Sequence, residues 1–340
     1  MFGGGRICLM RKVFTHSYDS IISIENLLLA WQNFVRGKRN KKDVQEFQLH
    51  LMDNVLDLHK DLKNKTYKHG SYESFSICDP KPRNIHKASV KDRLLHHAIY
   101  QILYPFFDKS FISDSYSCRN NKGTHKALKQ FRKYSNKVSK NDNRTVWILK
   151  CDIKKFFASV DHKTLMEIVG RNIKDKDITQ LIQEIVNSFC VEKGKGLPLG
   201  NLTSQLLANV YMNEFDKFVK HELKVKYYIR YADDFVFLSD DRKYLISILS
   251  KVQKFLETRL FLRLHENKVH IETWASGVDF LGWVNFPHCR VVRTVTKKRV
   301  FRGIKEKNGE TATVQSYLGL LSHGNTQKIK DNILCVLYLK

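Results

Sequence analysis

Three acidic residues have the surroundings of a metal-dependent centre. Asp152 ends a hydrophobic run, and Asp233-Asp234 stand between two short hydrophobic segments. Carboxylates held together repel one another, and a divalent cation relieves that repulsion. If neighbouring strands bring the three together, they can hold two Mg²⁺ ions about 3.5–4 Å apart. That arrangement activates a 3′-hydroxyl and stabilises departing pyrophosphate in phosphoryl transfer.

Each part of this set also has an ordinary structural explanation. An isolated aspartate at the end of a strand is usually a cap or a salt-bridge partner, and adjacent acids in a hairpin often serve only the turn. The combination is far more specific than either part. The surroundings of the first aspartate are also strongly basic, because residues 119–155 contain twelve Lys or Arg and only two acids, Asp142 and Asp152.

A glycine-bearing loop precedes a long predicted helix and reads Gly196-Leu197-Pro198-Leu199-Gly200-Asn201-Leu202-Thr203-Ser204-Gln205. Such a helix start offers backbone amides and hydroxyls to a nucleotide or a template base. A capped helix after a turn is the structural alternative.

One predicted helix, residues 122–138, carries five lysines on one face at spacings of four, three, four and four: Lys122, Lys126, Lys129, Lys133 and Lys137. Apolar residues occupy the opposite face, nearly 180° away at about 100° per residue. A charged outer face is ordinary, but five lysines without an acid favour contact with a nucleic-acid backbone. The loop 36–42 adds five basic residues in seven, as a solvated loop or a phosphate contact.

The elements that must position these residues follow from hydrophobic periodicity. Predicted strands cover 72–78, 83–87, 146–152, 226–230, 235–238, 269–272 and 280–285. Predicted helices cover 18–35, 43–63, 90–103 with its end at Pro105, 122–138, a segment starting at 162, 178–189, 203–221, 242–260 and 327–339. From 146 onward the order β-α-β-β-α-β predicts an antiparallel sheet with helices on one face.

Composition limits the function further. The 340 residues carry 59 Lys+Arg against 34 Asp+Glu, a net charge of +25, and 42% are hydrophobic. Such a chain can bury a substantial core, and its charge indicates a polyanionic partner. No run approaches the roughly 18 apolar residues of a spanning helix, so nucleic acid is favoured over a membrane. Seven scattered Cys without a C-x-x-C pair predict reduced thiols, no zinc site and a cytoplasmic protein.

In this order the segments resemble the reverse transcriptase family over roughly residues 72 to 290. Asp152 resembles the motif A aspartate, and Tyr231-Ala232-Asp233-Asp234 resembles motif C. The resemblance implies an α+β right-hand polymerase whose palm has a ferredoxin-like βαββαβ core. It also implies four parts: an N-terminal helical extension (1–71), fingers (72–143), a catalytic palm (144–289) and a short, basic, helical thumb (290–340).

The resemblance assigns roles residue by residue. Asp152, Ile153, Asp233 and Asp234 would hold two Mg²⁺ ions, for which Mn²⁺ can substitute, and Lys268 resembles the motif D lysine that protonates pyrophosphate. Phe157, five residues after Asp152, matches the steric gate against a ribose 2′-hydroxyl. The other expected nucleotide-binding residues are Lys81, Arg83, Leu199, Gly200 and Gln205. The expected primer grip is Phe280, Leu281, Gly282 and Trp283.

Within the family, the best match is to the reverse transcriptases of diversity-generating retroelements. Their motif B ends in Ser-Gln where most relatives have Ser-Pro, and Gly200 to Gln205 ends in Ser204-Gln205. Asp114-Ser115-Tyr116, His96-His97-Ala98 and the Lys122–Ala127 segment also resemble that group. Leu199 stands where many reverse transcriptases place a Gln, from which we infer looser control of base-pair geometry.

This resemblance implies error-prone copying of a template-repeat RNA into cDNA, with an RNA template, a DNA primer, dNTPs and a basic accessory protein as partners. The expected host is a prokaryote or a phage. One alternative is a group II intron-like, retron-like or phage-defence reverse transcriptase. Another is a non-catalytic RNA-binding protein with a polymerase fold, against which the retention of the three carboxylates, Lys268 and Arg83 argues.

Overall fold

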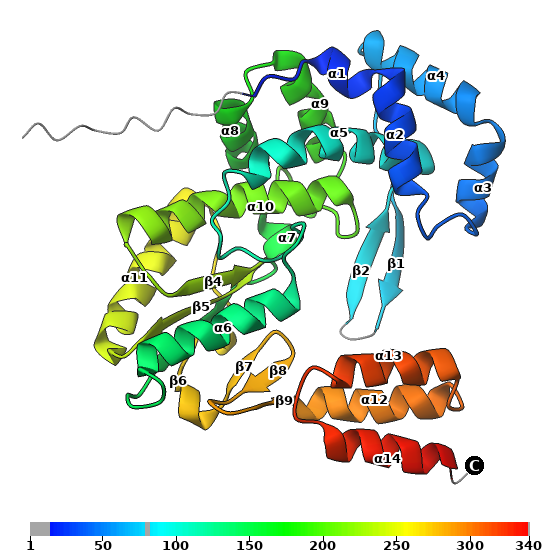
Figure 1. Ribbon diagram of the computed structural model, residues 1–340. Helices are drawn as coiled ribbons and strands as arrows, with labels where there is room; N and C mark the ends of the chain where they lie inside the picture. Colours follow the sequence, from blue (N-terminus) through cyan, green and yellow to red (C-terminus); the bar gives the residue numbers. More distant parts are fainter. Residues whose placement is uncertain (1–13, 79–81, 339–340) are drawn as a thin grey trace, which may run out of the picture. The chain divides into compact units, whose positions relative to one another are not determined.

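The computed structural model describes residues 14–78 and 82–338 and divides into two compact units (Figure 1). Unit 1 comprises the chain up to Ile77, Arg83–Phe111 and Lys155–Asn213. Unit 2 comprises Cys78–Pro82, Ile112–Lys154 and Glu214–Lys340. The division into extension, fingers, palm and thumb stays a prediction.

The central sheet of unit 2 has four antiparallel strands in the order β4-β5-β3-β6. They are β3 (Trp147–Asp152), β4 (Tyr228–Tyr231), β5 (Asp234–Ser239) and β6 (His270–Thr273). Helix α11 (Arg242–Arg259) connects β5 to β6, and the helices between β3 and β4 supply the other crossover. This is the predicted ferredoxin-like βαββαβ arrangement, which is therefore confirmed.

Both faces of this sheet are covered, so the expectation of helices on one face is wrong (Figure 1). Alternate strand residues such as Ile148 and Val236 share a buried cluster with Phe131 of helix α6 (Thr124–Ser139). The intervening residues face the other way, where Phe235 packs against Phe215 and α11 contacts β3 and β5. The cause is the period of two along each strand: both sets of side chains are apolar and each needs a cover.

The segment expected as one strand over 280–285 is a hairpin instead. It consists of β7 (Val278–Phe280) and β8 (Trp283–Asn285), and β9 (Arg290–Val292) completes a three-stranded sheet. The turn residues Leu281 and Gly282 both have positive φ, 52° and 89°, which suits a two-residue hairpin loop.

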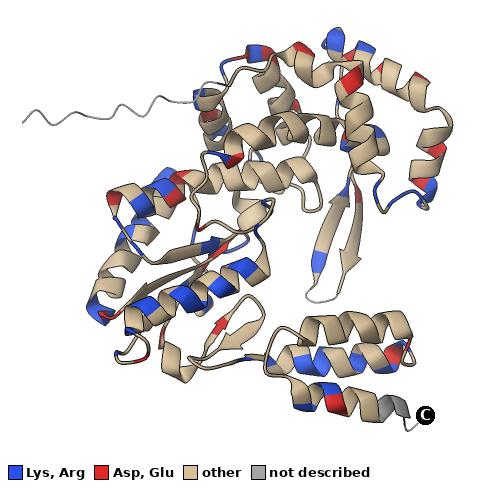
Figure 2. Cartoon of the chain, viewed as in Figure 1, with Lys and Arg blue, Asp and Glu red and all other residues tan. Residues whose placement is uncertain are grey.

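Three helices end unit 2: α12 (Thr294–Glu306), α13 (Thr311–Leu321) and α14 (Gln327–Tyr338). Only the last was predicted as a helix, but all three agree with a basic, helical C-terminal part. Figure 2 shows lysines and arginines along α12 and along α6.

Unit 1 is mostly helical. Its helices are α1 (Tyr18–Ile22), α2 (Ile24–Phe34), α3 (Lys42–Leu49), α4 (Leu51–Lys63), α5 (Val90–Asp108), α7 (Phe156–Ser159), α8 (His162–Asn172), α9 (Lys176–Asn187) and most of α10 (Leu202–Lys217). An antiparallel hairpin, β1 (Glu73–Ile77) with β2 (Arg83–Lys87), completes it. Along the chain, α10 passes into a π-helical turn, Phe218–Glu222, which belongs to unit 2.

Three helix boundaries differ from expectation. The first two predicted helices are each broken, at Ser23 and at His50. Helix α5 continues through Pro105 to Asp108, because Tyr104 and Phe107 are buried there and their packing outweighs the missing amide. Among the described residues, no helix is long and apolar enough to span a bilayer.

Candidate active site

The strand register brings the predicted carboxylates to one end of the central sheet. Asp152, the last residue of β3, is the direct cross-strand partner of Asp234, the first residue of β5. The backbone reinforces this end, because Ile153 N–H donates to the Asp233 carbonyl at 3.2 Å and His265 N–H donates to the Asp152 carbonyl at 2.8 Å. Opposed residues in a sheet have Cβ atoms about 4.5–5.5 Å apart, so the two side chains can share a ligand.

The turn that carries Asp233 is tight and conformationally unusual. Tyr231 pairs with Asp234, which leaves only Ala232 and Asp233 in the loop. Ala232 has a φ of 56°, a left-handed conformation that few residues other than glycine adopt. The Arg230 guanidinium donates from Nη1 to the Ala232 carbonyl at 3.0 Å and so stabilises the turn.

Arg230 itself belongs to a fully buried charge pair that sequence reasoning missed. Its Nε and Nη2 donate to the two carboxylate oxygens of Asp216 at 2.8 and 2.7 Å, and both residues have no exposed surface. Tyr228 Oη donates to Asp216 at 2.8 Å, and Arg230 Nη2 also donates to Ser115 Oγ at 3.0 Å. Burial opposes the charge of Arg230, but Asp216 outweighs burial and raises the pKa of the guanidinium.

A signal for this pair was present in the sequence. Asp114-Ser115-Tyr116 was noted only as a family resemblance, yet its backbone exchanges hydrogen bonds with Arg230: Arg230 N–H donates to Asp114, and Tyr116 N–H donates to Arg230. An arginine one residue from the motif C turn, at the end of an apolar strand, has to be paired if it is buried.

Asp234 is the electrostatically perturbed member of the acidic set. Its Oδ1 is buried and has no hydrogen-bond partner among the described residues. Burial raises the pKa of Asp234 to about 7, and the Asp152 and Asp233 carboxylates add to the effect while Lys150 opposes it. The site therefore carries a desolvated carboxylate whose charged form Lys150 compensates only in part.

Lys268 lies beside the acidic set, and its role as the motif D lysine stays a prediction. Its Nζ lies 2.9 Å from Asp152 Oδ1, and the side chains are 43% and 17% exposed. The lysine sits at the end of a short 3₁₀ turn, Glu266–Lys268, just before β6. Because β6 pairs with β3, the sheet holds this turn next to the end of the Asp152 strand.

The acidic set fits a divalent cation in its donor chemistry. An orphaned carboxylate oxygen on Asp234 opposite a second carboxylate provides hard oxygen ligands of the kind Mg²⁺ prefers. Within residues 14–78 and 82–338, however, no three His, Cys, Asp or Glu side chains converge closely enough to form a complete metal site. In this geometry the positive charge next to the Asp152 carboxylate is that of the Lys268 ammonium.

The described members of the predicted nucleotide-binding set lie in unit 1. Arg83 is exposed at the start of β2, and Phe157 is partly exposed in α7, where its carbonyl accepts from Leu197 N–H at 2.7 Å. The loop before α10 is bonded to the β1–β2 hairpin, since His86 N–H donates to the Leu199 carbonyl at 2.9 Å. Lys81 lies outside the described residues.

The contact between the β1–β2 hairpin and the loop before α10 requires glycine at position 200. Its φ is 111°, and a Cβ there would meet Ile85 Cγ2 at 2.9 Å, so a side chain would strain both backbone and packing. Gly200 and Gln205 line a cavity of about 390 Å³ together with Ile85 and Arg93, all in unit 1.

The sequence predicted five lysines on one face of a single helix, and four of the five lie exposed along α6. Lys126, Lys129, Lys133 and Lys137 are exposed along α6. Lys122 instead precedes that helix, which begins at Thr124 after Gly123 with φ 107°, and its Nζ donates to the Ser113 carbonyl at 2.7 Å. In the predicted primer grip Phe280 and Trp283 are buried core residues, and only the turn residues Leu281 and Gly282 are partly exposed.

Comparison with known proteins identifies the family. The model of the family described as reverse transcriptase (RNA-dependent DNA polymerase) matches residues 66–284. The chain belongs to the reverse transcriptase family. Within these 219 residues lie the three carboxylates, Lys268 and the predicted primer grip.

Individual relatives are distant. Protein YkfC of Escherichia coli is 25% identical over 256 residues, which are 62% of this chain and 66% of the relative. The group II intron-encoded protein LtrA of Lactococcus lactis is 24% identical over 278 residues, covering 77% of this chain and 45% of LtrA. The chain thus spans less than two thirds of the length of these relatives.

Among solved structures, telomerase from Candida tropicalis with a fragment of telomeric RNA matches with a TM-score of 0.51 and 13% identity, over 83% of this chain and 56% of that one. Telomerase from Candida albicans gives the same TM-score at 10% identity, over 68% and 48%. At this identity the likeness concerns the fold, and it confirms the predicted right-hand polymerase architecture.

Proposed function

We propose that the chain is an RNA-directed DNA polymerase that extends a DNA primer with dNTPs on an RNA template. The observation that carries this proposal is the direct opposition of Asp152 and Asp234 at one end of the palm sheet, with Lys268 beside them, in a member of the reverse transcriptase family. The right-hand fold supports it further.

In this proposal Asp152, Asp233, Asp234 and the main chain of Ile153 would hold two Mg²⁺ ions, or Mn²⁺ in their place. Bound there, the ions would activate the primer 3′-hydroxyl and neutralise charge on the triphosphate. The primer 3′-oxygen bonds to the α-phosphorus and its proton passes to solvent, while the bond from the α-phosphorus to pyrophosphate breaks and Lys268 gives a proton from Nζ to the leaving oxygen. The Arg230–Asp216 pair touches no reacting atom, but it positions the turn that carries Asp233 and Asp234.

The remaining predicted residues take the roles of binding and selection. Arg83 and Lys81 hold the triphosphate, and Phe157 excludes a ribose 2′-hydroxyl. Leu199, Gly200 and Gln205 contact the nucleotide or template base. Phe280, Leu281, Gly282 and Trp283 form the primer grip, whose reach to the primer rests on the exposed Leu281-Gly282 turn.

Primer extension on a defined RNA template tests the proposal. The wild-type protein with Mg²⁺ is expected to extend the primer, and Asp234→Asn to lose at least about 1,000-fold in rate, because it removes a carboxylate that would hold the cations needed to stabilise the transition state. Asp240→Asn is the matched control, since Asp240 lies in unit 2 but is exposed and pairs with Arg144. Extension by Asp234→Asn at the wild-type rate would overturn the metal assignment. A wild-type protein that binds RNA without extending a primer would establish the non-catalytic alternative.

The steric-gate assignment has its own test. Phe157→Ala is expected to raise rNTP incorporation relative to dNTP by about 10-fold or more, because a 2′-hydroxyl then meets no ring. Phe156→Leu is the matched control, since Phe156 is buried beside Phe157 and its ring faces the core. Equal sugar discrimination by wild type and Phe157→Ala would remove the assignment.

For the biological role we propose error-prone copying of a template-repeat RNA in a diversity-generating retroelement, with a basic accessory protein. Two sequence features support this role: motif B ends in Ser204-Gln205, and Leu199 directly precedes the motif at Gly200. Sequencing of cDNA made from an adenine-rich RNA is expected to show errors concentrated at template adenines. A uniform error spectrum would contradict it, and a matched RNA with adenines changed to guanines is the control.

The second candidate is a group II intron-like reverse transcriptase, favoured by the similarity to the intron-encoded protein LtrA. It predicts errors that are not concentrated at template adenines, and specific binding to an intron RNA. The same sequencing experiment, with an RNA-binding assay beside it, separates the two roles.

A further inference from the structure

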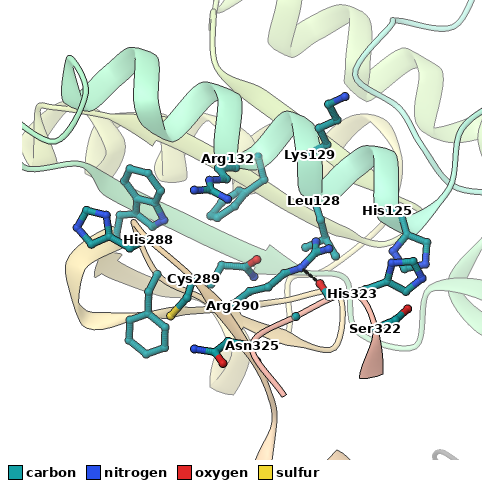
Figure 3. A pocket seen from close by; sticks show the side chains of 15 residues that line it. His125, Leu128, Lys129, Arg132, His288, Cys289, Arg290, Ser322, His323 and Asn325 are labelled. Atoms are coloured by element: carbon teal, nitrogen blue, oxygen red, sulfur yellow. Dashed lines mark hydrogen bonds between the residues drawn. The ribbon is translucent and has the colours of Figure 1, made fainter. Parts of the chain in front are cut away.

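Unit 2 contains a cavity of about 670 Å³ that the proposed chemistry does not use (Figure 3). We call it the basic cavity. Its basic lining comes from the following residues: His125, Lys129 and Arg132 from α6, His288 and Arg290 from the turn before β9 and from β9 itself, and His323 from the connection between α13 and α14. Figure 3 shows Arg132 and Arg290 in the middle of the group and the His125–His323 pair at one end.

The charge of this lining is uncompensated. Among the described residues that line the basic cavity, none is Asp or Glu. Arg290 donates from Nε to the His323 carbonyl, and its guanidinium lies 5.2 Å from the Trp283 ring centroid, so its known partners are neutral. Burial, together with the nearby Arg132, lowers the pKa of Arg290. Two guanidiniums that line one cavity without a carboxylate favour binding of an anion there.

The histidine pair adds ring N–H donors at one end of the basic cavity. The His125 and His323 ring centroids are 3.8 Å apart. Burial and the neighbouring His323 and Arg290 lower the pKa of His125, which favours its neutral form. A neutral imidazole still provides an N–H, so this end of the basic cavity can donate a hydrogen bond to a phosphate oxygen without a further charge.

The basic cavity is also continuous with the exposed lysines of α6. Arg132 lies three residues after Lys129, so their side chains are neighbours on the helix surface, and Lys129 itself lines the basic cavity. A polyanionic strand that contacts Lys129 therefore also meets Arg132. The volume is in the range of about 300–1,000 Å³ typical of ligand pockets and accommodates one nucleotide.

We propose that the basic cavity binds one nucleotide of a nucleic-acid strand, with its phosphodiester between Arg132 and Arg290. This inference rests on the proposed function, since it supplies a second grip on the nucleic acid that the polymerase copies or makes. Arginine suits the role because its planar guanidinium donates two parallel hydrogen bonds to a phosphate.

The test is the salt dependence of binding to an RNA·DNA hybrid, measured by fluorescence anisotropy without dNTPs. In Arg132→Gln/Arg290→Gln the log–log slope against salt is expected to become shallower by about two, because each lost phosphate contact removes about one unit. The binding constant near 0.15 M salt is expected to fall about 10- to 100-fold. Lys251→Gln/Lys254→Gln is the matched control: it removes two exposed charges of α11 and should leave the slope unchanged.

Arg132→Gln alone guards against misfolding, because Arg132 is exposed and its loss should reduce the slope by about one with an unchanged melting temperature. An unchanged slope in both variants, or an equal change in the control, would overturn the inference. Competition by free dNTP or inorganic phosphate that abolishes the difference at millimolar concentration would also overturn it, in favour of a small-anion site. Primer extension by the wild type, measured separately, reports on the proposed function whatever the slope.

Discussion

Two cation–aspartate pairs in unit 2 use the same chemistry in opposite surroundings. Arg230 and Asp216 join at 2.7 Å with both side chains fully buried. Lys268 and Asp152 join at 2.9 Å with side chains 43% and 17% exposed. In the first pair Nε, Nη1 and Nη2 of the guanidinium are all bonded to protein oxygens. In the second a single contact holds a flexible lysine.

This difference in burial indicates different roles for the two pairs. The buried pair is a fixed structural contact, whereas the half-exposed lysine can exchange partners. A buried pair with complete hydrogen bonding cannot exchange partners without leaving a charge in a low-dielectric interior. A half-exposed lysine can leave its carboxylate at small cost, because water and incoming phosphates replace the lost contact. Arg230–Asp216 therefore fixes the motif C turn, whereas the weak contact of Lys268 with Asp152 agrees with the proposal that this lysine moves to the substrate.

The largest expected effect comes from breaking the buried pair. Asp216→Asn keeps the side-chain shape but leaves the Arg230 charge uncompensated, so the free energy of unfolding should fall by about 3–5 kcal/mol. Urea unfolding followed by circular dichroism measures it. Arg230→Gln combined with Asp216→Asn should be less destabilised than the sum of the single variants, because the second change removes the orphaned charge. Additive losses would show that the pair is not coupled.

A smaller effect on the reaction, and almost none on stability, is expected from Lys268. Lys268→Met should slow the chemical step about 100-fold, equivalent to about 2.7 kcal/mol, through loss of the general acid. The unfolding free energy should change by less than about 1 kcal/mol, because the pair with Asp152 is partly exposed. Single-turnover kinetics measure the first value and urea unfolding the second.

The conservative variant sharpens this prediction. Lys268→Arg keeps the charge beside Asp152 but does not release a proton near neutral pH. It should retain RNA·DNA affinity, whereas the chemical step should slow about as much as in Lys268→Met, because no proton is given to the leaving pyrophosphate. A Lys268→Arg enzyme with the wild-type rate would assign the lysine a purely electrostatic role.

Cation binding should distinguish Asp216 from Asp234. Both carboxylate oxygens of Asp216 accept hydrogen bonds, whereas Asp234 Oδ1 has no hydrogen-bond partner among the described residues. At ten times its Kd, Mg²⁺ should stabilise the protein by about 1.4 kcal/mol, since it binds the folded carboxylates and not the unfolded chain. Asp234→Asn should abolish most of that gain, because it removes the buried oxygen that has no partner. Melting temperatures at constant ionic strength measure both. An equal Mg²⁺ response in Asp234→Asn would place the cation elsewhere.

The sequence predicted most of the palm because its signals are local. Apolar runs of strand length, separated by helical patterns, predicted the βαββαβ order, and acids at strand ends predicted that Asp152 and Asp234 would meet. Lys268 was predicted by resemblance, and the β3–β6 pairing places it beside Asp152.

What could not be predicted depends on packing between distant segments. The Arg230–Asp216 pair joins a strand to a helix, and burial of both charges is visible only when the fold is known. Helix α5 passes Pro105 because tertiary packing compensates for a poor local propensity. The Leu281-Gly282 turn was missed because leucine is unusual at positive φ, so the apolar run read as one continuous strand.

The smallest expected effect comes from a third pair, Arg144 with Asp240, which lies at 3.4 Å with both side chains about half exposed. Asp240→Asn should change the unfolding free energy by less than about 0.5 kcal/mol, because solvent and salt screen such a pair. Raising the salt concentration to about 0.5 M should remove even that change, whereas the loss in Asp216→Asn should persist. The three pairs differ in how far they are buried, so comparing them tests the effect of burial. If Asp240→Asn lowered the free energy of unfolding as much as Asp216→Asn, burial would not explain the difference between the Arg230–Asp216 pair and the Lys268–Asp152 pair.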